Sequence, residues 1–338
     1  MKKTAILGAA ALAAIAGGAH AATLDDVKAR GELNCGTNTG LAGFAAPDAN
    51  GVWQGFDVAF CRAVAAAVLG DPMKVKFVPT TGATRFTALA AGEIDMLSRV
   101  TTWTFKRDVE LGFTFMPTTY YDGQGFMVKK DLGVSSAKEL DGATVCIQTG
   151  TTTELNLADF FRASGMKYEP VPIETNAEGQ QQFLAGACDA YTTDASGLAA
   201  SRATFANPEN YVILPEIISK EPLAPLVRQG DDQWADIVRW TTFAIIAAEE
   251  YGVTSENADQ MAADPNANPE VKRLLGVEEN LGGLFGLDAQ WALRAIKGVG
   301  NYGEIFAKNL GETTPIGLAR GLNAQWTQGG LQYAPPFR

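Results

Sequence analysis

The spacing of apolar positions changes repeatedly along this chain, and the changes predict strands that alternate with helices. Short runs rich in β-branched and aromatic residues are typical of strands. Between them lie longer stretches in which apolar residues recur every three or four positions, as in helices. Two series of the form βαβαβ follow one another. This order is typical of parallel sheets covered by helices, so the pattern predicts an α/β protein.

The first series lies between residues 33 and 97. Its spacing predicts strands over Leu33–Thr37, Val75–Pro79 and Ile94–Leu97. A helix is expected to begin at Asp57, with this aspartate as its N-cap, and another covers Arg85–Ala91. The second series predicts strands over Gln124–Lys129, Thr144–Gln148, Tyr168–Ile173 and Ala187–Thr192, with helices over Ser136–Leu140, Leu155–Ser164 and Ala177–Ala185.

The remaining pattern brings the chain back to its first part. Leu223–Val227 predicts a return strand. We therefore expect a first lobe of residues 22–124 and 226–338, and a second of residues 125–225. Two crossings between lobes make a hinge, and ligands bind in clefts beside such sheets. Helices are predicted over Trp234–Glu250, Ala258–Ala263, Pro269–Leu275, Asp288–Val299, Tyr302–Leu310 and Gly317–Thr327.

Residues 1–21 have the layout of a cleaved signal peptide. Lys2 and Lys3 precede an apolar run, Ala5–Ala16, and small residues flank a cut after Ala21. The run is too short to span a bilayer, so the mature chain is expected to be soluble and exported. His20 is the only histidine, and its removal excludes catalytic triads and zinc sites that need imidazole.

Composition narrows the range of partners. The chain has 27 Lys and Arg against 38 Asp and Glu, with 46% hydrophobic residues, which describes a folded acidic protein. It lacks the basic stripe of a nucleic-acid-binding protein. The glycine pattern Gly298–Gly303 follows a helical pattern instead of a strand, so it does not indicate a dinucleotide site. We expect neither a cofactor nor a metal.

Four cysteines allow three disulfide pairings in an exported protein. We prefer Cys35–Cys61 and Cys146–Cys188, because each pair falls within one segment of the chain. Free buried thiols are the alternative, since cysteine also packs as a small hydrophobe.

Three segments offer charge-binding chemistry. Thr101–Arg107 follows a strand, and its hydroxyls and Arg107 suit a carboxylate, unless Arg107 only pairs with Asp108 or Glu110. The Gly150–Glu154 turn opens a helix and offers amide donors, unless it serves only as a cap. Asp194 ends a strand and suits an ammonium group, unless it only forms a turn. Together these groups match a zwitterion.

Several motifs occur in order, and together they resemble the polar amino-acid-binding proteins of ABC importers. The stretches Tyr120–Phe126 and Gly298–Phe306 resemble a longer branch of this family, which contains general L-amino-acid and glutamate/glutamine/aspartate/asparagine-binding proteins. The resemblance covers essentially the whole mature chain. It implies a type II periplasmic-binding-protein fold with a mixed, mostly parallel sheet in each lobe, two hinge segments and a helical C-terminal extension. The motifs are Gly55–Val58, Ala63–Ala65, Leu89–Asp95, Thr102–Arg107, Gly150–Thr152 and Asp189–Asp194.

The resemblance also implies roles for single residues. Arg107, with the Thr102 hydroxyl and the Thr152 amide, would hold the α-carboxylate of an amino acid. Asp194 and the Val100 carbonyl would hold its ammonium group. Further ligand contacts are implied for Asn38 and Gln148.

Arg85 carries the selectivity of the site by the same resemblance. It matches the arginine that meets a side-chain carboxylate in acidic-amino-acid binders, which favours Glu, Gln, Asp and Asn as ligands. A broad set that includes aliphatic and basic amino acids stays open as the alternative. The alternative is a helix-start arginine paired with Glu93 or Asp95. Arg99 is a lesser candidate for the same role, with a structural role favoured.

The chain is therefore expected to be the substrate-binding component of an ABC amino-acid importer in a Gram-negative periplasm. It would act as a monomer and pass its ligand to a permease and an ATPase. The alternative is a periplasmic enzyme on the same scaffold, such as a dehydratase. An enzyme would need a general acid or base, and Glu154 is the carboxylate nearest the site besides Asp194.

Overall fold

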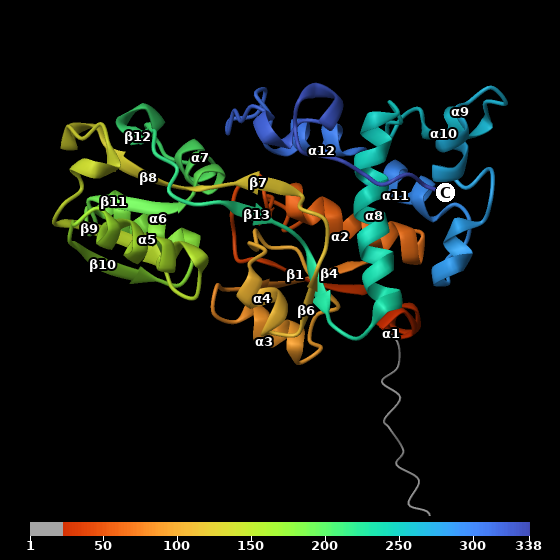
Figure 1. Cartoon of the computed structure of the whole chain (residues 1–338), viewed down its shortest axis with the longest axis horizontal. Helices are drawn as coiled ribbons and strands as arrows, with labels where there is room; N and C mark the ends of the chain where they lie inside the picture. Colours follow the sequence, from red (N-terminus) through yellow and green to blue (C-terminus); the bar gives the residue numbers. More distant parts are fainter. Residues whose placement is uncertain (1–22) are drawn as a thin grey trace, which may run out of the picture.

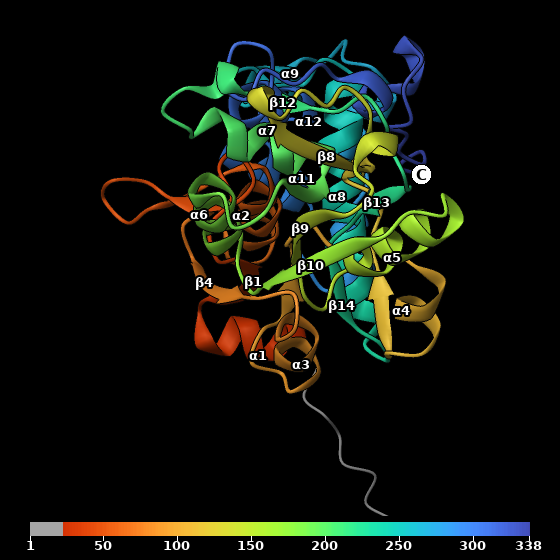
Figure 2. The same ribbon diagram turned by 90° about the vertical axis from the view of Figure 1, so that its left-hand side faces the viewer.

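The structure is a computed structural model that describes residues 23–338; the expected signal peptide, residues 1–21, lies outside the described residues. Two five-stranded sheets form the centres of two lobes, which lie side by side along the long axis of the molecule (Figure 1). Viewed from the end, the second lobe lies in front of the first (Figure 2).

Lobe 1, as we call the part built on the first sheet, has a mixed sheet in which β1 pairs in parallel with β4 and β5. β14 returns from the other lobe and pairs antiparallel with β5 and β6. The strand order is β4 (Val75–Thr80), β1 (Leu33–Asn38), β5 (Met96–Leu97), β14 (Leu226–Arg228) and β6 (Phe113–Phe115). The helices of its N-terminal part are α1 (Thr23–Arg30), α2 (Phe56–Leu69), α3 (Arg85–Ala90) and α4 (Phe105–Val109), and a short hairpin joins β2 (Ala46–Pro47) to β3 (Trp53–Gln54).

Lobe 2 is built on the second sheet, in which β8 runs antiparallel to the four other strands. Its order is β10 (Tyr168–Ile173), β9 (Ala143–Gln148), β11 (Ala190–Asp194), β8 (Gln124–Lys129) and β12 (Tyr211–Ile213). The expected α/β class is therefore confirmed in both lobes. The α-helices of lobe 2 are α5 (Thr152–Ala163), α6 (Asn176–Ala185) and α7 (Ala195–Ala203), and short 3₁₀ turns cover η1 (Lys130–Leu132), η2 (Ala137–Glu139) and η3 (Pro208–Asn210).

Two strands link the lobes and pair with each other. β7 (Tyr120–Asp122) leads into β8, and β13 (Glu221–Leu223) leads back to β14. They run antiparallel, with Glu221 opposite Asp122 and Leu223 opposite Tyr120. We call this pair the hinge ribbon, and Figure 1 shows it between the two lobes.

The C-terminal helices pack on α2 and enlarge the core of lobe 1. Trp234 of α8 is buried, and its indole N–H donates to the Asp95 carbonyl at 2.9 Å, which joins this helix to the sheet. These helices are α8 (Asp232–Glu250), α9 (Ala258–Ala263), α10 (Pro269–Leu274), α11 (Trp291–Val299) and α12 (Tyr302–Asn309).

The helix predicted over Gly317–Thr327 is wrong. This segment holds only the 3₁₀ turns η5 (Gly321–Asn323) and the start of η6 (Trp326–Gln328). Gly317 and Gly321 have φ of 68° and 49°, which an α-helix does not allow. The Asn323 side chain instead accepts the Tyr121 N–H and donates to the Tyr121 carbonyl. These hydrogen bonds hold the segment against the hinge ribbon.

Asp57 does not cap α2 as expected. The N-cap is Gly55, and Asp57 lies inside the first turn, buried beneath the sheet edge. Its Oδ2 accepts the Val100 N–H at 2.8 Å. The carboxylate therefore holds a loop of lobe 1 instead of the start of its own helix.

Both preferred disulfides are present. Cys35–Cys61 joins β1 to α2, and Cys146–Cys188 joins β9 to the residues before β11, with Cα–Cα distances of 6.2 and 5.6 Å. Each bond stays within one lobe.

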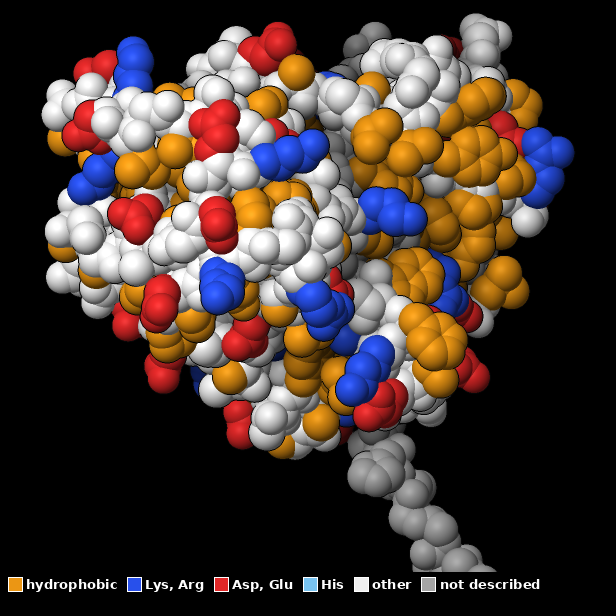
Figure 3. Space-filling model, turned by 60° about the vertical axis from the view of Figure 1, so that its left-hand side comes forward, with side chains coloured by type: hydrophobic (Ala, Val, Ile, Leu, Met, Phe, Trp, Pro, Cys, Tyr) orange, Lys and Arg blue, Asp and Glu red, His pale blue; other side chains and the backbone are white. Residues whose placement is uncertain are grey.

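The surface is mixed in character. Figure 3 shows charged side chains of both signs scattered over one face, with apolar side chains gathered toward its right-hand edge. Large apolar side chains exposed on the molecule include Phe105, Trp326 and Tyr333. Among residues 23–338, no helix has the length and hydropathy needed to cross a bilayer.

Candidate ligand-binding site

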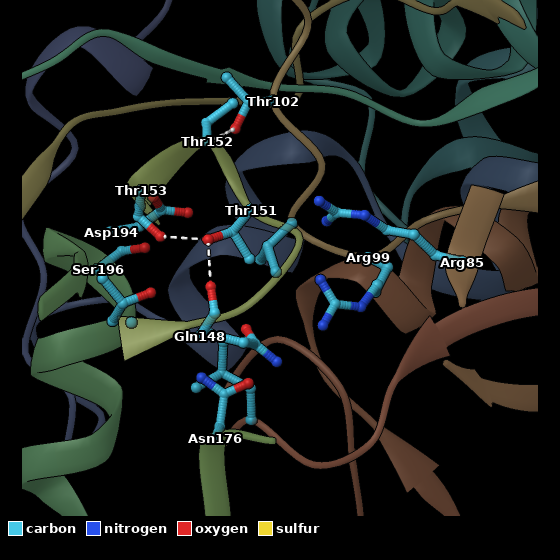
Figure 4. A pocket seen from close by; sticks show the side chains of 14 residues that line it. Arg85, Arg99, Thr102, Gln148, Thr151, Thr152, Thr153, Asn176, Asp194 and Ser196 are labelled. Atoms are coloured by element: carbon cyan, nitrogen blue, oxygen red, sulfur yellow. Dashed lines mark hydrogen bonds between the residues drawn. The ribbon is translucent and has the colours of Figure 1, made fainter. Parts of the chain in front are cut away.

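A cavity of about 430 Å³, counting the part open to solvent, lies where the two lobes meet (Figure 4). Its walls are mainly polar and come from both lobes. Lobe 1 supplies Leu41, Arg85, Arg99, Val100 and Thr102, and lobe 2 supplies Gln148, Thr151, Thr152, Thr153, Asn176, Thr193, Asp194, Ser196 and Gly197.

The lobes are closed on each other around this cavity. Asn38 of lobe 1 donates its amide to Asn176 Oδ1 of lobe 2 at 3.2 Å. The hydroxyls of Thr102 and Thr152 lie 3.2 Å apart. Asn38 is therefore a closing contact beside the cavity and does not line it, whereas Asn176, which the sequence did not indicate, does.

Arg85 and Arg99 form one wall of the cavity. Each is only 2% exposed. Burial lowers the pKa of Arg85, and the neighbouring charges of Arg99 and Arg107 lower it further. Burial also lowers the pKa of Arg99 to about 10. Arg85 does not pair with Glu93 or Asp95, because no ion pair of Arg85 occurs in the described part of the chain.

Arg107 is buried beside the cavity but is not among its lining residues. The start of α4, where Thr104 caps the helix, places its guanidinium so that Nη1 donates to the Thr102 carbonyl at 3.0 Å. Burial lowers the pKa of Arg107, while the charges of Glu221 and Asp194 oppose that shift. Neither Asp108 nor Glu110 pairs with it; Glu110 pairs with Lys106 instead.

Asp194 lies at the end of β11 and faces the cavity from lobe 2. It occupies the N-cap position of α7, but its side chain makes no capping hydrogen bond. Burial raises its pKa well above the usual range, and the nearby carboxylates of Asp122 and Glu221 act in the same direction. An ammonium group placed here would offset the cost of ionising this buried acid.

Val100 presents its backbone to the cavity in a strained conformation. Its φ is +38°, which is rare for a β-branched residue. The bond from its N–H to Asp57 holds this geometry. Strain of this kind costs roughly 1–3 kcal/mol and gathers at functional sites.

The Gly150–Glu154 turn contributes three threonines to the wall. Thr151 caps α5 by accepting the Glu154 N–H, and the Glu154 carboxylate accepts the Gly150 N–H at 3.0 Å. The capping alternative thus accounts for Glu154, while Thr151, Thr152 and Thr153 line the cavity. Gln148 also lines it, and its amide donates to the Glu174 carbonyl at 2.6 Å.

Glu221 of the hinge ribbon is a buried residue that the sequence analysis missed. Its carboxylate accepts four hydrogen bonds from both sides of the cleft, at 2.6–2.8 Å. The donors are Thr102 of lobe 1, Thr152 and Asn156 of lobe 2, and Ser219. Glu221 follows Lys220 and precedes Pro222, and this surrounding sequence carries no signal for such a role.

A search of known families finds one match over most of the chain. Residues 33–257 match the bacterial extracellular solute-binding proteins, family 3. The chain belongs to this family. Its compartment is the periplasm, and its role is to bind a substrate for uptake. Within residues 23–338, no cluster of three or more His, Cys, Asp or Glu suited to a metal occurs.

Two relatives match over nearly their full length. The glutamate/glutamine/aspartate/asparagine-binding protein of Rhodobacter capsulatus is 69% identical over 100% of both chains. The general L-amino acid-binding periplasmic protein of Rhizobium johnstonii is 60% identical over 99% of this chain and 98% of its own.

A solved structure is also similar over most of the chain. It is an ABC transporter periplasmic binding protein from Brucella ovis with glutathione bound. It is 56% identical with a TM-score of 0.91, covering 94% of this chain and 100% of the other. The expected two-lobed type II fold is confirmed by this likeness and by the two mixed sheets.

Proposed function

We propose that this periplasmic protein captures a free L-amino acid, with Glu, Gln, Asp and Asn favoured, and presents it to an ABC permease and its ATPase. The observation that carries the proposal is the cavity between the closed lobes, which brings guanidinium groups from one lobe to face Asp194 of the other. A zwitterion with a polar side chain matches this arrangement. The named ligands of the two relatives support the same class.

We further infer the roles of single residues. Opening the lobes would separate Thr102 from Thr152 and uncover Arg107 for the ligand. After closure, Arg107 would hold the α-carboxylate with the Thr102 hydroxyl and the Thr152 amide. Asp194 and the Val100 carbonyl would hold the ammonium group. Arg85, Asn38 and Gln148 would meet the side chain or close over it. Because the ligand touches both lobes only when they are closed, it shifts the population toward that state.

The surroundings of the site support this role. Both cavity walls come from a single chain, so a monomer is a complete binding unit. Exposed apolar side chains such as Phe105, Trp326 and Tyr333 offer surface to a protein partner. The finer proposal, that the ligand leaves chemically unchanged, follows from the family role of binding solutes.

Calorimetry on ligand-free protein tests the proposal. Among the common amino acids, Glu, Gln, Asp and Asn should bind most tightly and raise the unfolding temperature. N-acetyl-L-glutamate, which lacks the ammonium group, serves as the matched control and should bind at least about tenfold more weakly, since Asp194 would lose its charged partner. Absence of binding by every amino acid, or a changed mass of the recovered ligand, would refute it.

A further inference from the structure

Arg99 and Arg85 approach the cavity from the same side. Figure 4 shows their guanidinium groups next to each other, pointing into the space in front of Gln148 and Asn176. Both residues line the cavity and are almost fully buried. This wall therefore carries two cations, where the sequence indicated one.

The hydrogen bonds of these two arginines are incomplete. Arg99 Nε donates to the Thr80 carbonyl at 3.0 Å, but its Nη2 has no partner within the described residues. Arg85 makes two long contacts, 3.4 Å each, to the Thr101 hydroxyl and the Gly150 carbonyl, and its Nε has none. Buried donors without partners are rare in proteins, so these donors point to a ligand that accepts from them.

The charge on this wall is also uncompensated by direct contact. In residues 23–338, no carboxylate lies within 4.0 Å of either guanidinium. A zwitterionic backbone brings no net charge to the site. An anionic side chain would contact both cations directly, whereas a neutral amide would leave them opposed only by acids beyond 4.0 Å, such as Asp57 and Asp194.

We propose that Arg99 is a specificity-determining residue, which with Arg85 forms a subsite for the side-chain carboxylate of the ligand. The inference rests on the proposed function and sharpens it: Glu and Asp are bound more tightly than Gln and Asn. Two planar guanidinium groups, each with several N–H donors, suit the two acceptor oxygens of a carboxylate. An amide offers one acceptor oxygen, and its NH₂ group faces a second donor.

If Arg99 had only a structural role, replacing it would have a different effect on ligand binding. Its bond to Thr80 supports the end of β4, and losing that support would weaken the binding of all ligands alike. The subsite instead predicts a change in the ratio between acidic and amide ligands.

The first experiment needs no variant. Calorimetry on the ligand-free wild-type chain should show Glu bound roughly 10- to 100-fold more tightly than Gln, the range expected for hydrogen bonds to charged groups, and Asp more tightly than Asn. Equal affinities for the acid and the amide would overturn the inference. Failure to bind any amino acid would instead refute the proposed function.

The second experiment assigns the effect to Arg99. Arg99→Gln should weaken Glu binding by roughly 10- to 100-fold and change Gln binding by less than about threefold. Arg99→Lys should keep part of the preference for Glu, because the charge remains. Arg62→Gln is the control, since Arg62 is half-buried on α2 and donates to the Trp53 carbonyl away from the cavity.

An equal loss of Glu and Gln binding in Arg99→Gln would show a structural role and overturn the inference. Circular dichroism and thermal unfolding report whether each variant folds. If Arg99→Gln does not fold, the ratio of Glu affinity to Gln affinity is compared between the wild type and Arg99→Lys. An unchanged ratio in Arg99→Lys also counts against a role of Arg99 in specificity.

Discussion

Gly82 lies where the loop before α3 meets the opposite lobe. A Cβ atom built on it would come within 2.6 Å of the Thr149 carbonyl, closer than real Cβ atoms approach a backbone oxygen. The clash exists only when the lobes are closed, because the two residues belong to different lobes. The absence of a side chain at this position therefore allows the closed state to form.

We expect Gly82→Ala to weaken ligand binding about 5- to 150-fold, since relieving the overlap costs roughly 1–3 kcal/mol. The unfolding temperature of the ligand-free protein should stay nearly unchanged, because an open form avoids the clash. Calorimetry and thermal unfolding check the two halves of this prediction. Gly125→Ala, whose added Cβ would make an ordinary 3.5 Å contact, is the control; comparable loss there would contradict the explanation.

Asp57 should make stability depend on pH. Burial raises its pKa to about 7, above the 3.8 of an exposed aspartate. The folded state then holds more protons than the unfolded state between these values, so this contribution to stability is fully present below about pH 4 and is lost as the pH rises through 7. The shift corresponds to a loss on the order of 4 kcal/mol.

We expect Asp57→Asn to flatten this decline, because asparagine keeps an acceptor for the Val100 N–H without the titration. Urea unfolding of ligand-free protein at pH 5 and pH 8 measures the effect. Asp25→Asn on the exposed face of α1 is the control. An unchanged pH slope in Asp57→Asn would rule out this assignment.

At the same scale, the sequence indicated part of the site. Arg85, Thr102, Val100, Gln148, Thr152 and Asp194 line one cavity, because each follows or ends a strand at the edge where ligands bind. Arg99 was expected to be structural, and Glu221 was missed, because neither is marked by a local pattern. Their positions depend on how the two lobes meet, which a linear sequence does not display.

At the scale of elements, the hinge ribbon takes part in the hydrogen bonds that hold the two lobes closed. Glu221 of β13 joins Thr102 of lobe 1 to Thr152 and Asn156 of α5. Both carboxylate oxygens of Glu221 accept hydrogen bonds, two each. In a glutamine, an NH₂ group replaces one of these oxygens and would face two hydrogen-bond donors. The closed arrangement of β13 and α5 would then lose hydrogen bonds.

We expect Glu221→Gln to destabilise the closed state by roughly 1–3 kcal/mol, which lowers ligand affinity about 5- to 150-fold. Calorimetry measures the affinity, and small-angle scattering should show a larger radius of gyration with ligand present. Glu216→Gln is the control, because Glu216 binds Ser136 and the Ala137 N–H within lobe 2. An equal effect in both variants would argue against the hinge explanation.

Element prediction from the sequence succeeded where periodicity is strong. β8, β10 and α9 have the predicted bounds, and β8 is buried at every position except its last. The return stretch 223–227 instead splits into β13 and β14, separated by Ala224 and Pro225. The segment 317–327 has helical spacing, but its glycines and the Asn323 side chain impose a different backbone.

The two disulfides act within lobes at the scale of the whole molecule. They close loops with sequence separations of 26 and 42 residues. Each is expected to stabilise its own lobe without limiting the hinge, because neither connects one lobe to the other.

Replacing either pair by alanine should therefore lower stability by about 2–5 kcal/mol, the usual cost of removing a native disulfide. Ligand affinity should change by less than about threefold at a temperature where the variant is folded. Chemical denaturation and calorimetry test both statements. A large loss of affinity in a folded Cys146→Ala, Cys188→Ala protein would show that the bond shapes the cavity.

The pairing of β7 with β13 has a consequence for the covalent integrity of the molecule. After a protease cuts the backbone within β7, β13 still connects lobe 2 covalently to the C-terminal part of lobe 1. Noncovalent contacts, including the pairing of β7 with β13, hold the N-terminal fragment in place. The nicked protein should migrate as one species under native conditions. Denaturation alone should then release two fragments without a reducing agent, because each cystine has both of its sulfurs in the same fragment.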